Sequence, residues 1–525
     1  MRAQTAIEQH LREHARTRGD ELWLSFKDQR YTWRDALRLA TRAANGLLEA
    51  GVGAGDAVSI LSRNRPEFIW AYLGCLMIGA AFVPLNRQQS VSILRHMATD
   101  ADVRVVLHDE EAHGLVQALR SELPRLRTVI AFDEPQRQPG DIRFASLMDQ
   151  PDREPDIVLR TAPSVVRIIY TSGTTGIPKG IVQNNYEESL GPILDALQFA
   201  PGMTFYSCNP LFHAGGLYIG VLGTIRRGAG FALGDRFSAS GYWDECRRHG
   251  ATAGHLFSSM LPMLLQQPQR ADDGDQPVRR MLAVGCPPPA WQPFSQRFGV
   301  RIVELYAMSD APGMTLNVDG KPCTAGKPVA GSQFRIVKPD GQDAAPGEVG
   351  EIVFRHPLGQ VTSYQNMPEA TAQAWQGGWF HSGDVGRFDE DGDLVFVGRV
   401  KEAIRRRGEN VSAWEVASVI ETHPAIRECA VFGVPSELGE EEVMVTVALR
   451  DGADLRPEEL VAFCEGRLAA FAVPRFIDVV DALPRTGTQK IQTLELKERG
   501  RTATTWDRQA VQGRLPLHGS LATRA

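Results

Sequence analysis

The sequence predicts an α/β protein with a large N-terminal domain built from βαβ units, an antiparallel β subdomain and a small α+β C-terminal domain. Three observations predict this fold class. The chain has 525 residues, which is too long for one ordinary domain. Short apolar runs alternate with helix-periodic segments as far as Tyr170, as in parallel sheets with crossover helices. Beyond about residue 330, turns rich in Asp-Gly and Pro-Gly break the chain into short strands.

The N-terminal elements begin with a helix over 33–50, where apolar side chains recur at helical spacing and Gly51 ends the helix. The run 68–85 carries no charge, but two glycines and a proline interrupt it. It therefore predicts a buried helix over 66–78 and then a buried strand, not a membrane span. The other expected elements are strand 57–61, strand 81–85, helix 90–99, strand 103–108, helix 111–121 and a strand ending at Tyr170.

The C-terminal part of the sequence shows two different patterns of predicted secondary structure. Residues 331–356 and 383–399 predict the antiparallel β subdomain, which spans about 330–398. Ser412 and Glu415 form a capping-box pattern that opens a helix. The α+β elements expected after it are strands 428–434, 442–450 and 476–481 with helices 457–469 and 491–499. The tail, 501–525, is polar and expected to be loose.

Composition excludes several classes of protein. The net charge of −6 argues against binding nucleic acid or a membrane surface by charge alone. The N-terminus has no apolar core of a signal peptide, and the 7 cysteines include no C-x-x-C pair. We therefore expect a cytoplasmic protein without integral membrane contact and without a disulfide scaffold. The chain has 8 lysines against 49 arginines, so a lysine inside a motif indicates a need for its compact ammonium.

One segment carries a chemical signal of its own. Residues 170–180, YTSGTTGIPKG, follow a strand and contain four serine or threonine hydroxyls, three glycines and Lys179. Glycines let backbone N–H groups approach a phosphate, and hydroxyls and the ammonium add donors to its oxygens. The Walker A pattern is absent. The segment predicts a phosphate-binding loop of another type.

This loop resembles that of the adenylate-forming (ANL) superfamily, which includes acyl-CoA synthetases, and five further segments resemble the family's motifs in the expected order. They are 209–216, NPLFHAGG; 284–287, VGCP; 304–310, ELYAMSD; 379–384, WFHSGD; and 483–491, LPRTGTQKI, with the hinge-like GRVKE at 398–402. The resemblance covers about residues 20–500. It implies the ANL fold, with an N-terminal AMP-binding domain (1–398), a hinge (399–401) and a mobile C-terminal domain (402–500).

The resemblance also implies site residues. Catalytic roles fall to Lys490, His213 and Lys179. The acid pocket takes His213, Gly215, Gly216, Ser258, Gly285 and Ala307, and the metal takes Thr174 and Asp310. Contacts to the nucleotide or CoA are implied for Thr171, Ser172, Gly173, Thr174, Thr175, Gly176, Gly285, Cys286, Pro287, Glu304, Tyr306, Ala307, Met308, Ser309, Asp384, Arg399, Lys401, Arg405, Gly408 and Glu409. The glycines beside His213 also suggest a roomy pocket for a bulky or cyclic acid.

The implied reaction joins a carboxylic acid to CoA. The acid attacks the α-phosphorus of ATP with Mg²⁺ present, giving acyl-AMP and pyrophosphate. The C-terminal domain then turns about the hinge, so that the CoA thiol replaces Lys490 at the acyl group. Arg405, Arg406 and Arg407 either hold the phosphates of CoA or form a solvated basic face. A homodimer is left open.

One motif departs from the family's pattern of tyrosine, glycine, a variable residue, threonine and glutamate. Here it reads Tyr306, Ala307, Met308, Ser309 and Asp310. Two interpretations stay open: drift with activity retained, or weakened ATP handling in a ligase that takes acyl-AMP from a partner adenylating enzyme. Loading of a carrier protein and a non-catalytic nucleotide-binding homologue also stay open as functions of the whole chain.

Overall fold

The structure is a computed structural model that describes residues 7–133, 140–153, 155, 166–170, 178–183, 190–257, 260–355, 362–399, 403–406, 409–436, 441–486 and 489–512. It divides into two compact units. The first comprises Met1–Arg335, Val353–Ser382 and Asp389–Leu394. The second comprises Ile336–Ile352, Gly383–Phe388 and Val395–Ala525.

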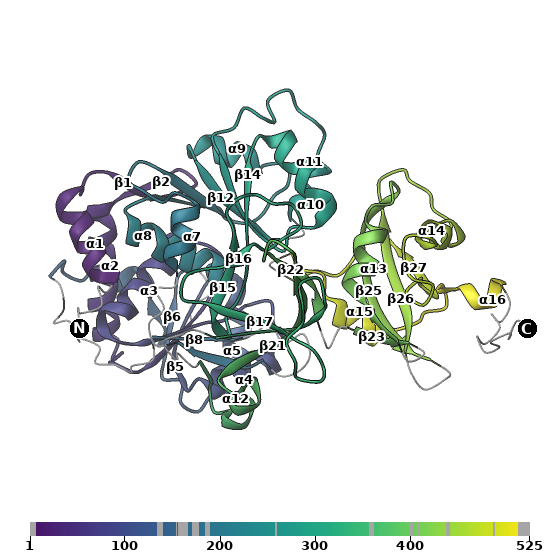
Figure 1. Ribbon diagram of the computed structural model, residues 1–525. Helices are drawn as coiled ribbons and strands as arrows, with labels where there is room; N and C mark the ends of the chain where they lie inside the picture. Colours follow the sequence, from purple (N-terminus) through teal and green to yellow (C-terminus); the bar gives the residue numbers. More distant parts are fainter. Residues whose placement is uncertain are drawn as a thin grey trace, which may run out of the picture. The chain divides into compact units, whose positions relative to one another are not determined.

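Two large sheets form the framework of the first unit (Figure 1). In one sheet the strand order is β19 (Ser363–Tyr364), β9 (Gly180–Gln183), β8 (Arg167–Tyr170), β4 (Ala81–Pro84), β3 (Ala57–Leu61), β5 (Val103–His108), β6 (Thr128–Ala131) and β7 (Ile142–Arg143). Strands β8, β4, β3, β5, β6 and β7 pair in parallel, and β9 and β19 are antiparallel. This parallel order with intervening helices confirms the predicted βαβ construction.

The second sheet has the order β16 (Lys327–Pro328), β15 (Ala311–Asn317), β14 (Arg301–Met308), β13 (Arg280–Val284), β12 (Ala253–Phe257), β10 (Thr204–Ser207), β11 (Gly230–Leu233), β1 (Leu22–Phe26) and β2 (Gln29–Thr32). Its central strands are parallel, while β15, β16 and β2 are antiparallel to their neighbours. The central strands therefore end at the same edge of the sheet.

The helices of the first unit are α1 (Ile7–Thr17), α2 (Trp33–Glu49), α3 (Pro66–Ile78), α4 (Val91–Asp100), α5 (His113–Arg120), α6 (Phe144–Leu147), α7 (Gly191–Ala196), η3 (Gly215–Gly223), α8 (Thr224–Arg227), α9 (Tyr242–Arg248), α10 (Met260–Leu265), α11 (Pro288–Phe298) and α12 (Pro368–Ala374), with the short turn η1 (Glu110–Ala112). Local sequence explains their ends. Thr32 and Asp35 form a capping box at α2, and Ser90 accepts the Ile93 N–H at α4.

The apolar run 68–85 forms α3 and β4, as predicted. Helix α3 begins with Pro66 and ends at Gly79, whose φ of 75° is left-handed. Its side chains are buried on every side within one core cluster. At Gly74 a Cβ would lie 2.9 Å from the Ala44 backbone nitrogen, so the glycine lets α2 and α3 pack closely. Among the described helices, none is both long and apolar enough to cross a bilayer.

A third sheet corresponds to the predicted antiparallel region. Its order is β17 (Gln333–Val337), β18 (Gly350–Arg355), β21 (Trp379–Phe388) and β20 (Trp375–Gln376), with β22 (Leu394–Arg399) paired to β21. Asp-Gly and Pro-Gly turns were the sequence signal for these short strands.

The second unit contains a hairpin, β23 (Ala403–Arg406) with β24 (Glu409–Ser412), and a four-stranded sheet in the order β25 (Ile426–Pro435), β26 (Glu441–Leu449), β27 (Phe476–Val480) and β28 (Trp506–Asp507). Its helices are α13 (Ala413–Ile420), α14 (Pro457–Cys464), α15 (Thr493–Arg499) and α16 (Arg508–Gln512) (Figure 1). Ser412 caps α13 by accepting the Glu415 N–H, as predicted. Helix α14 ends five residues earlier than the sequence pattern suggested.

The prediction of a loose tail after Arg501 was wrong for its first part. Strand β28 pairs with β27, and Asp507 forms an ion pair with Arg475 at 3.1 Å. Trp506 packs against the core of this unit and donates from Nε1 to Glu458. One tryptophan and one aspartate thus anchor a segment whose overall composition is polar.

Candidate functional site

Four parallel strands bring predicted site residues to one edge of the second sheet. Asn209 and His213 follow β10, and Gly285 follows β13. Phe257 is the last residue of β12, and β14 ends with Ala307 and Met308. Because the carboxyl ends of parallel strands meet, residues far apart in sequence converge there. This edge is the common position of ligand sites in open α/β sheets.

Glu304 fastens the loop 285–287 to strand β14. The Cys286 backbone N–H donates to Glu304 Oε1 at 3.0 Å, and Gly285 bends the chain with a φ of 74°. Glu304 is 7 % exposed, and its Oε2 has no hydrogen-bond partner among the described residues. Burial raises the pKa of Glu304 to about 8, and the N–H groups of Cys286 and Gly285 only partly offset this. Burial likewise raises the pKa of the Cys286 thiol.

The raised pKa of Glu304 predicts a pH-dependent stability difference. The folded protein holds this proton up to about pH 8, whereas the unfolded chain releases it near 4.5. Ionisation of Glu304 therefore does not lower the free energy of unfolding below pH 4.5. The free energy of unfolding falls as pH rises from 4.5 to about 8, and the loss is complete above pH 8. Glu304→Gln keeps the oxygen that accepts from Cys286 but cannot ionise. Its melting temperature should rise relative to wild type between pH 5 and 9, because each pKa unit is worth about 1.4 kcal/mol. A constant difference across that range would contradict the assignment.

The altered motif lies at the turn from β14 to β15. Tyr306 is buried. Its ring packs edge-on against Phe334 and Phe354, with ring centres 6.2 and 6.4 Å apart. Ala307 pairs with Met314, and the register shifts between Ala307 and Met308. Met308 ends the strand, and Ser309 and Asp310 form the turn after it.

Asp310 is held by strand β19. Tyr364 donates from its hydroxyl to Asp310 Oδ2 at 2.7 Å, and Thr362 Oγ1 donates to the Asp310 carbonyl. Lys179 Nζ lies 4.7 Å from the centre of the Tyr364 ring. The structure thus brings the predicted metal residue Asp310 and the predicted catalytic residue Lys179 to the same tyrosine. Sequence reasoning had assigned no role to Tyr364.

The Asp310 carboxylate suits the Mg²⁺ that the resemblance implies. Mg²⁺ is a hard cation that prefers carboxylate and water oxygens, and the bond from Tyr364 fixes the orientation of this carboxylate. The other predicted metal residue, Thr174, lies outside the described residues. A second acidic group, Asp389, Asp391 and Asp393, has ligand spacing, but all three contact the Lys321 ammonium at 2.6–3.1 Å. That group is a surface ion-pair cluster.

The predicted acid pocket contains a second histidine that the sequence did not reveal. The His213 ring meets Phe257 edge-on at 5.0 Å, and the His255 ring lies 5.0 Å from the same phenylalanine. His255 is 1 % exposed, and its Nδ1 contacts the Asn209 amide at 2.8 Å. Burial lowers the pKa of His255 to about 3, with a smaller contribution from His213, so the ring stays neutral.

The two glycines next to His213 do not leave open space, contrary to the expectation of a roomy pocket. A Cβ at Gly215 would lie 2.4 Å from His255 Cε1, and one at Gly216 would lie 2.7 Å from the Pro210 carbonyl oxygen. At Gly254 a Cβ would meet the Tyr242 hydroxyl at 2.7 Å. Close packing of η3 against β12 and the preceding loop therefore explains these residues, and they say nothing about the size of the acid.

This packing predicts the effect of one added methyl group. Gly215→Ala should lower the free energy of unfolding by about 1–3 kcal/mol, because His255 is buried and has no room to move aside. Gly114→Ala in α5 is the matched control, since a Cβ there meets nothing within 4 Å. Alanine in that helix should be neutral or stabilising by up to about 1 kcal/mol. Urea unfolding of both variants measures the difference, and equal effects would contradict the packing explanation.

In the second unit, two residues predicted to contact the nucleotide form an ion pair with each other. Arg399 Nε lies 3.0 Å from Asp384 Oδ1, and the Asp384 side chain is 4 % exposed. They occupy the paired strands β21 and β22. The arginine thus compensates a buried carboxylate that the resemblance assigns to the ribose hydroxyls.

Lys490 lies on an anchored turn of the same unit. Arg485 and Ile491 form a bridge across the turn, and the Thr486 N–H donates to the Lys490 carbonyl at 2.8 Å. Arg485 also donates to the Gln489 carbonyl and forms an ion pair with Glu428. Lys490 itself is exposed. The turn fixes the backbone of the lysine while its side chain reaches solvent.

Several predicted residues cannot be placed. Thr171, Ser172, Gly173, Thr174, Thr175, Gly176, Ser258, Lys401 and Gly408 lie outside the described residues, as do the side chains of Arg405 and Glu409. Arg406 is described and corrects an expectation. It is 2 % exposed, lies 2.6 Å from Glu442, and donates to the carbonyls of Phe471 and Val473. It is neither a solvated residue nor available to phosphates of CoA.

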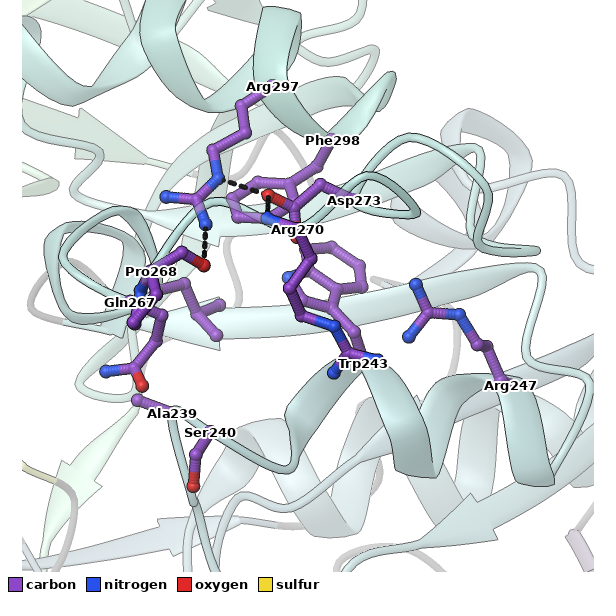
Figure 2. Close-up of a pocket in the computed structure, with 11 residues that line it drawn as sticks. Ala239, Ser240, Trp243, Arg247, Gln267, Pro268, Arg270, Asp273, Arg297 and Phe298 are labelled. Atoms are coloured by element: carbon purple, nitrogen blue, oxygen red, sulfur yellow. Dashed lines mark hydrogen bonds and ion pairs between the residues drawn. The ribbon is translucent and has the colours of Figure 1, made fainter.

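A small cavity in the first unit lies among residues that belong to none of the motifs (Figure 2). Its volume is about 20 Å³, room for roughly one water molecule. Arg297 forms an ion pair with Asp273 at 2.7 Å and donates to the Pro268 carbonyl, while the Arg270 backbone N–H donates to Asp273 Oδ2 at 3.0 Å. The cavity is therefore part of a structural ion-pair network.

Comparisons with known proteins agree with these motifs. The AMP-binding enzyme family matches residues 11–364, and the AMP-binding enzyme C-terminal domain matches 415–490. Oxalate–CoA ligase of Arabidopsis thaliana is 32% identical over 476 residues, covering 86% of this chain and 90% of that protein. Crotonobetaine/carnitine–CoA ligase of Salmonella arizonae is 30% identical over 491 residues, covering 89% and 93%.

The solved structure of o-succinylbenzoate CoA synthetase from Bacillus subtilis, in complex with its acyl-adenylate intermediate, superimposes with a TM-score of 0.79. It is 27% identical, and the match covers 93% of this chain and 97% of that one. The chain therefore belongs to the AMP-binding enzyme family and is an ATP-dependent acid–thiol ligase of the acyl-CoA synthetase branch of the adenylate-forming superfamily.

Proposed function

We propose that this protein carries out both steps of acyl-CoA synthesis, forming an acyl-adenylate from a carboxylic acid and ATP and then the CoA thioester. The observation that carries the proposal is the environment of Asp310. Although shorter than glutamate, it is held by Tyr364 beside Lys179, so the altered motif keeps an ordered carboxylate next to the phosphate loop. This favours complete activity over a ligase restricted to the thiol step.

The first step brings two anions together, because the carboxylate attacks the α-phosphorus and pyrophosphate leaves. Lys490 donates to the oxygens where negative charge grows, and Lys179 with the adjoining loop receives the pyrophosphate. Asp310 and Thr174 would hold Mg²⁺, which neutralises phosphate charge when bound. Glu304 keeps the loop 285–287 in position to line the nucleotide.

The second step requires the CoA thiol at the position that Lys490 occupied. We place the exchange at a hinge over 399–401, between an N-terminal domain (1–398) and a C-terminal domain (402–500). His213 and Phe257 border the acyl group in this scheme. The relatives' acids range from oxalate to crotonobetaine and o-succinylbenzoate, so the substrate screen covers small, charged and aromatic acids.

A mass-spectrometric screen of carboxylic acids with ATP and Mg²⁺ tests the proposal, reading acyl-AMP and acyl-CoA separately with and without CoA. Acyl-AMP without CoA and acyl-CoA with it would support two-step activity. Acyl-CoA formed only from supplied acyl-AMP would instead indicate the thiol-step ligase. Transfer of the acyl group to a carrier protein in place of CoA would indicate a loading enzyme, and no product with any acid would favour the non-catalytic homologue.

A further inference from the structure

Tyr364 contacts three separate parts of the first unit. Its hydroxyl donates to Asp310 Oδ2 at 2.7 Å, across 54 residues of sequence. The face of its ring lies 4.7 Å from Lys179 Nζ. Its backbone pairs with Ile181 in β9, the strand that follows Lys179, and the next residue, Gln365, donates to the Gly180 carbonyl at 2.6 Å. One side chain therefore ties the end of the phosphate loop to the altered motif.

The two interactions of this tyrosine use different parts of the ring. The hydroxyl donates one hydrogen bond to a carboxylate, which is a stronger interaction than a bond between neutral groups. The electron-rich face attracts the ammonium of Lys179. The backbone of Tyr364 is anchored, because its N–H donates to Thr371 Oγ1 at 2.9 Å and β19 pairs with β9. The position of Asp310 is thus set by a rigid sheet edge.

We infer that Tyr364 is a positioning residue for the adenylation step, holding the Asp310 carboxylate and the Lys179 ammonium in the arrangement that receives the metal-bound phosphates of ATP. The inference rests on the proposed two-step function. It explains how a motif ending in aspartate retains an oriented carboxylate, since a hydroxyl fixed at the sheet edge sets the direction in which the shorter side chain points. The residue does not touch the acyl group and has no part in the thiol step.

Tyr364→Phe is the informative variant, because it removes the hydroxyl and keeps the ring beneath Lys179. We expect pyrophosphate release to slow by about 10-fold to 100-fold and to need more Mg²⁺ for half-saturation, since a hydrogen bond to a charged group is lost. Thioester formation from supplied acyl-AMP should stay within about 2-fold of wild type. Tyr364→Leu also removes the ring face and should slow pyrophosphate release further.

A binding measurement tests the inference without turnover. Electron paramagnetic resonance of free Mn²⁺, titrated with protein and a non-hydrolysable ATP analogue, should show weaker Mn²⁺ binding to Tyr364→Phe than to wild type. Tyr218→Phe is the matched control, because Tyr218 also donates its hydroxyl, to Gln183, and also carries a cation over its ring, with Arg167 at 4.3 Å. That variant should keep the wild-type Mn²⁺ affinity.

The outcomes of these experiments test the positioning role of Tyr364 separately from the proposed two-step function. If Tyr364→Phe matches Tyr218→Phe in Mn²⁺ affinity and in pyrophosphate release, Tyr364 has no positioning role. An equal loss in both half-reactions, with a lowered melting temperature, would reduce the tyrosine to a structural residue and also overturn the inference. If wild type makes no acyl-AMP from any acid, the proposed function fails, while the Mn²⁺ titration still decides whether Tyr364 orients Asp310.

Discussion

Lys490→Ala is expected to remove acyl-adenylate formation almost completely while leaving thioester formation from supplied acyl-AMP near the wild-type rate. The Arg485–Ile491 bridge and the Thr486 N–H fix the backbone of the turn that carries this exposed lysine, and in the proposed scheme its ammonium donates to the negative charge that grows in the transition state. Loss of one such donor costs about 2.7–4 kcal/mol of transition-state stabilisation, or 10²–10³ in rate. Lys490→Arg should restore little, because a planar guanidinium does not replace a compact ammonium.

Lys497→Ala is the matched control for this experiment. Lys497 lies in the same unit and pairs with Glu441 at 2.9 Å, but it belongs to no site motif. Its loss should leave both half-reactions unchanged. Rapid-quench measurement of acyl-AMP without CoA, and of acyl-CoA from synthetic acyl-AMP, separates the steps. Equal loss of both half-reactions in Lys490→Ala would exclude a role confined to adenylation.

Glu442→Gln should destabilise the second unit by about 3–5 kcal/mol, because it leaves a buried guanidinium without its carboxylate. Arg406 and Glu442 are 3% and 2% exposed, and their atoms approach to 2.6 Å. Arg475 contacts the same carboxylate at 3.7 Å, so two cations share it. In a protein whose total stability is only about 5–15 kcal/mol, this loss should be visible as a markedly lower melting temperature.

The neighbouring residue supplies the control. Lys497 and Glu441 pair at 44% and 29% side-chain exposure, where solvent weakens the interaction. Glu441→Gln should therefore change stability by no more than about 1 kcal/mol. Scanning calorimetry of the full-length protein compares the two variants. Similar melting temperatures for both would show that the buried pair contributes no more than an exposed one.

Much of the fold followed from local sequence. Apolar periodicity, Pro66 and Gly79 predicted α3 and the strand after it, and Ser412 predicted the start of α13. These signals work because a helix end or a buried strand depends on residues a few positions apart. Helix α14 ended early because Glu465 is extended and Gly466 has a left-handed φ of 78°, so the apolar residues after Arg467 do not continue the helix.

The site was predicted less completely than the fold. The motifs located Glu304, Asp310, Asp384 and Lys490 but gave no view of what each side chain contacts. The partners that matter come from distant segments: His255 meets Asn209 across 46 residues, and Tyr364 meets Asp310 across 54. The sequence analysis gave no role to His255 or Tyr364, and the assembled sheets reveal their contacts.

The sequence by itself indicated the class of reaction, because the phosphate loop, the rare lysines and the order of motifs can be read directly along the chain. The tertiary structure decided how those groups are held: that packing requires Gly215, that Arg406 belongs to a buried ion pair, and that a tyrosine orients Asp310. The physical reason is that orientation and burial arise from contacts between strands remote in sequence, which no local pattern encodes.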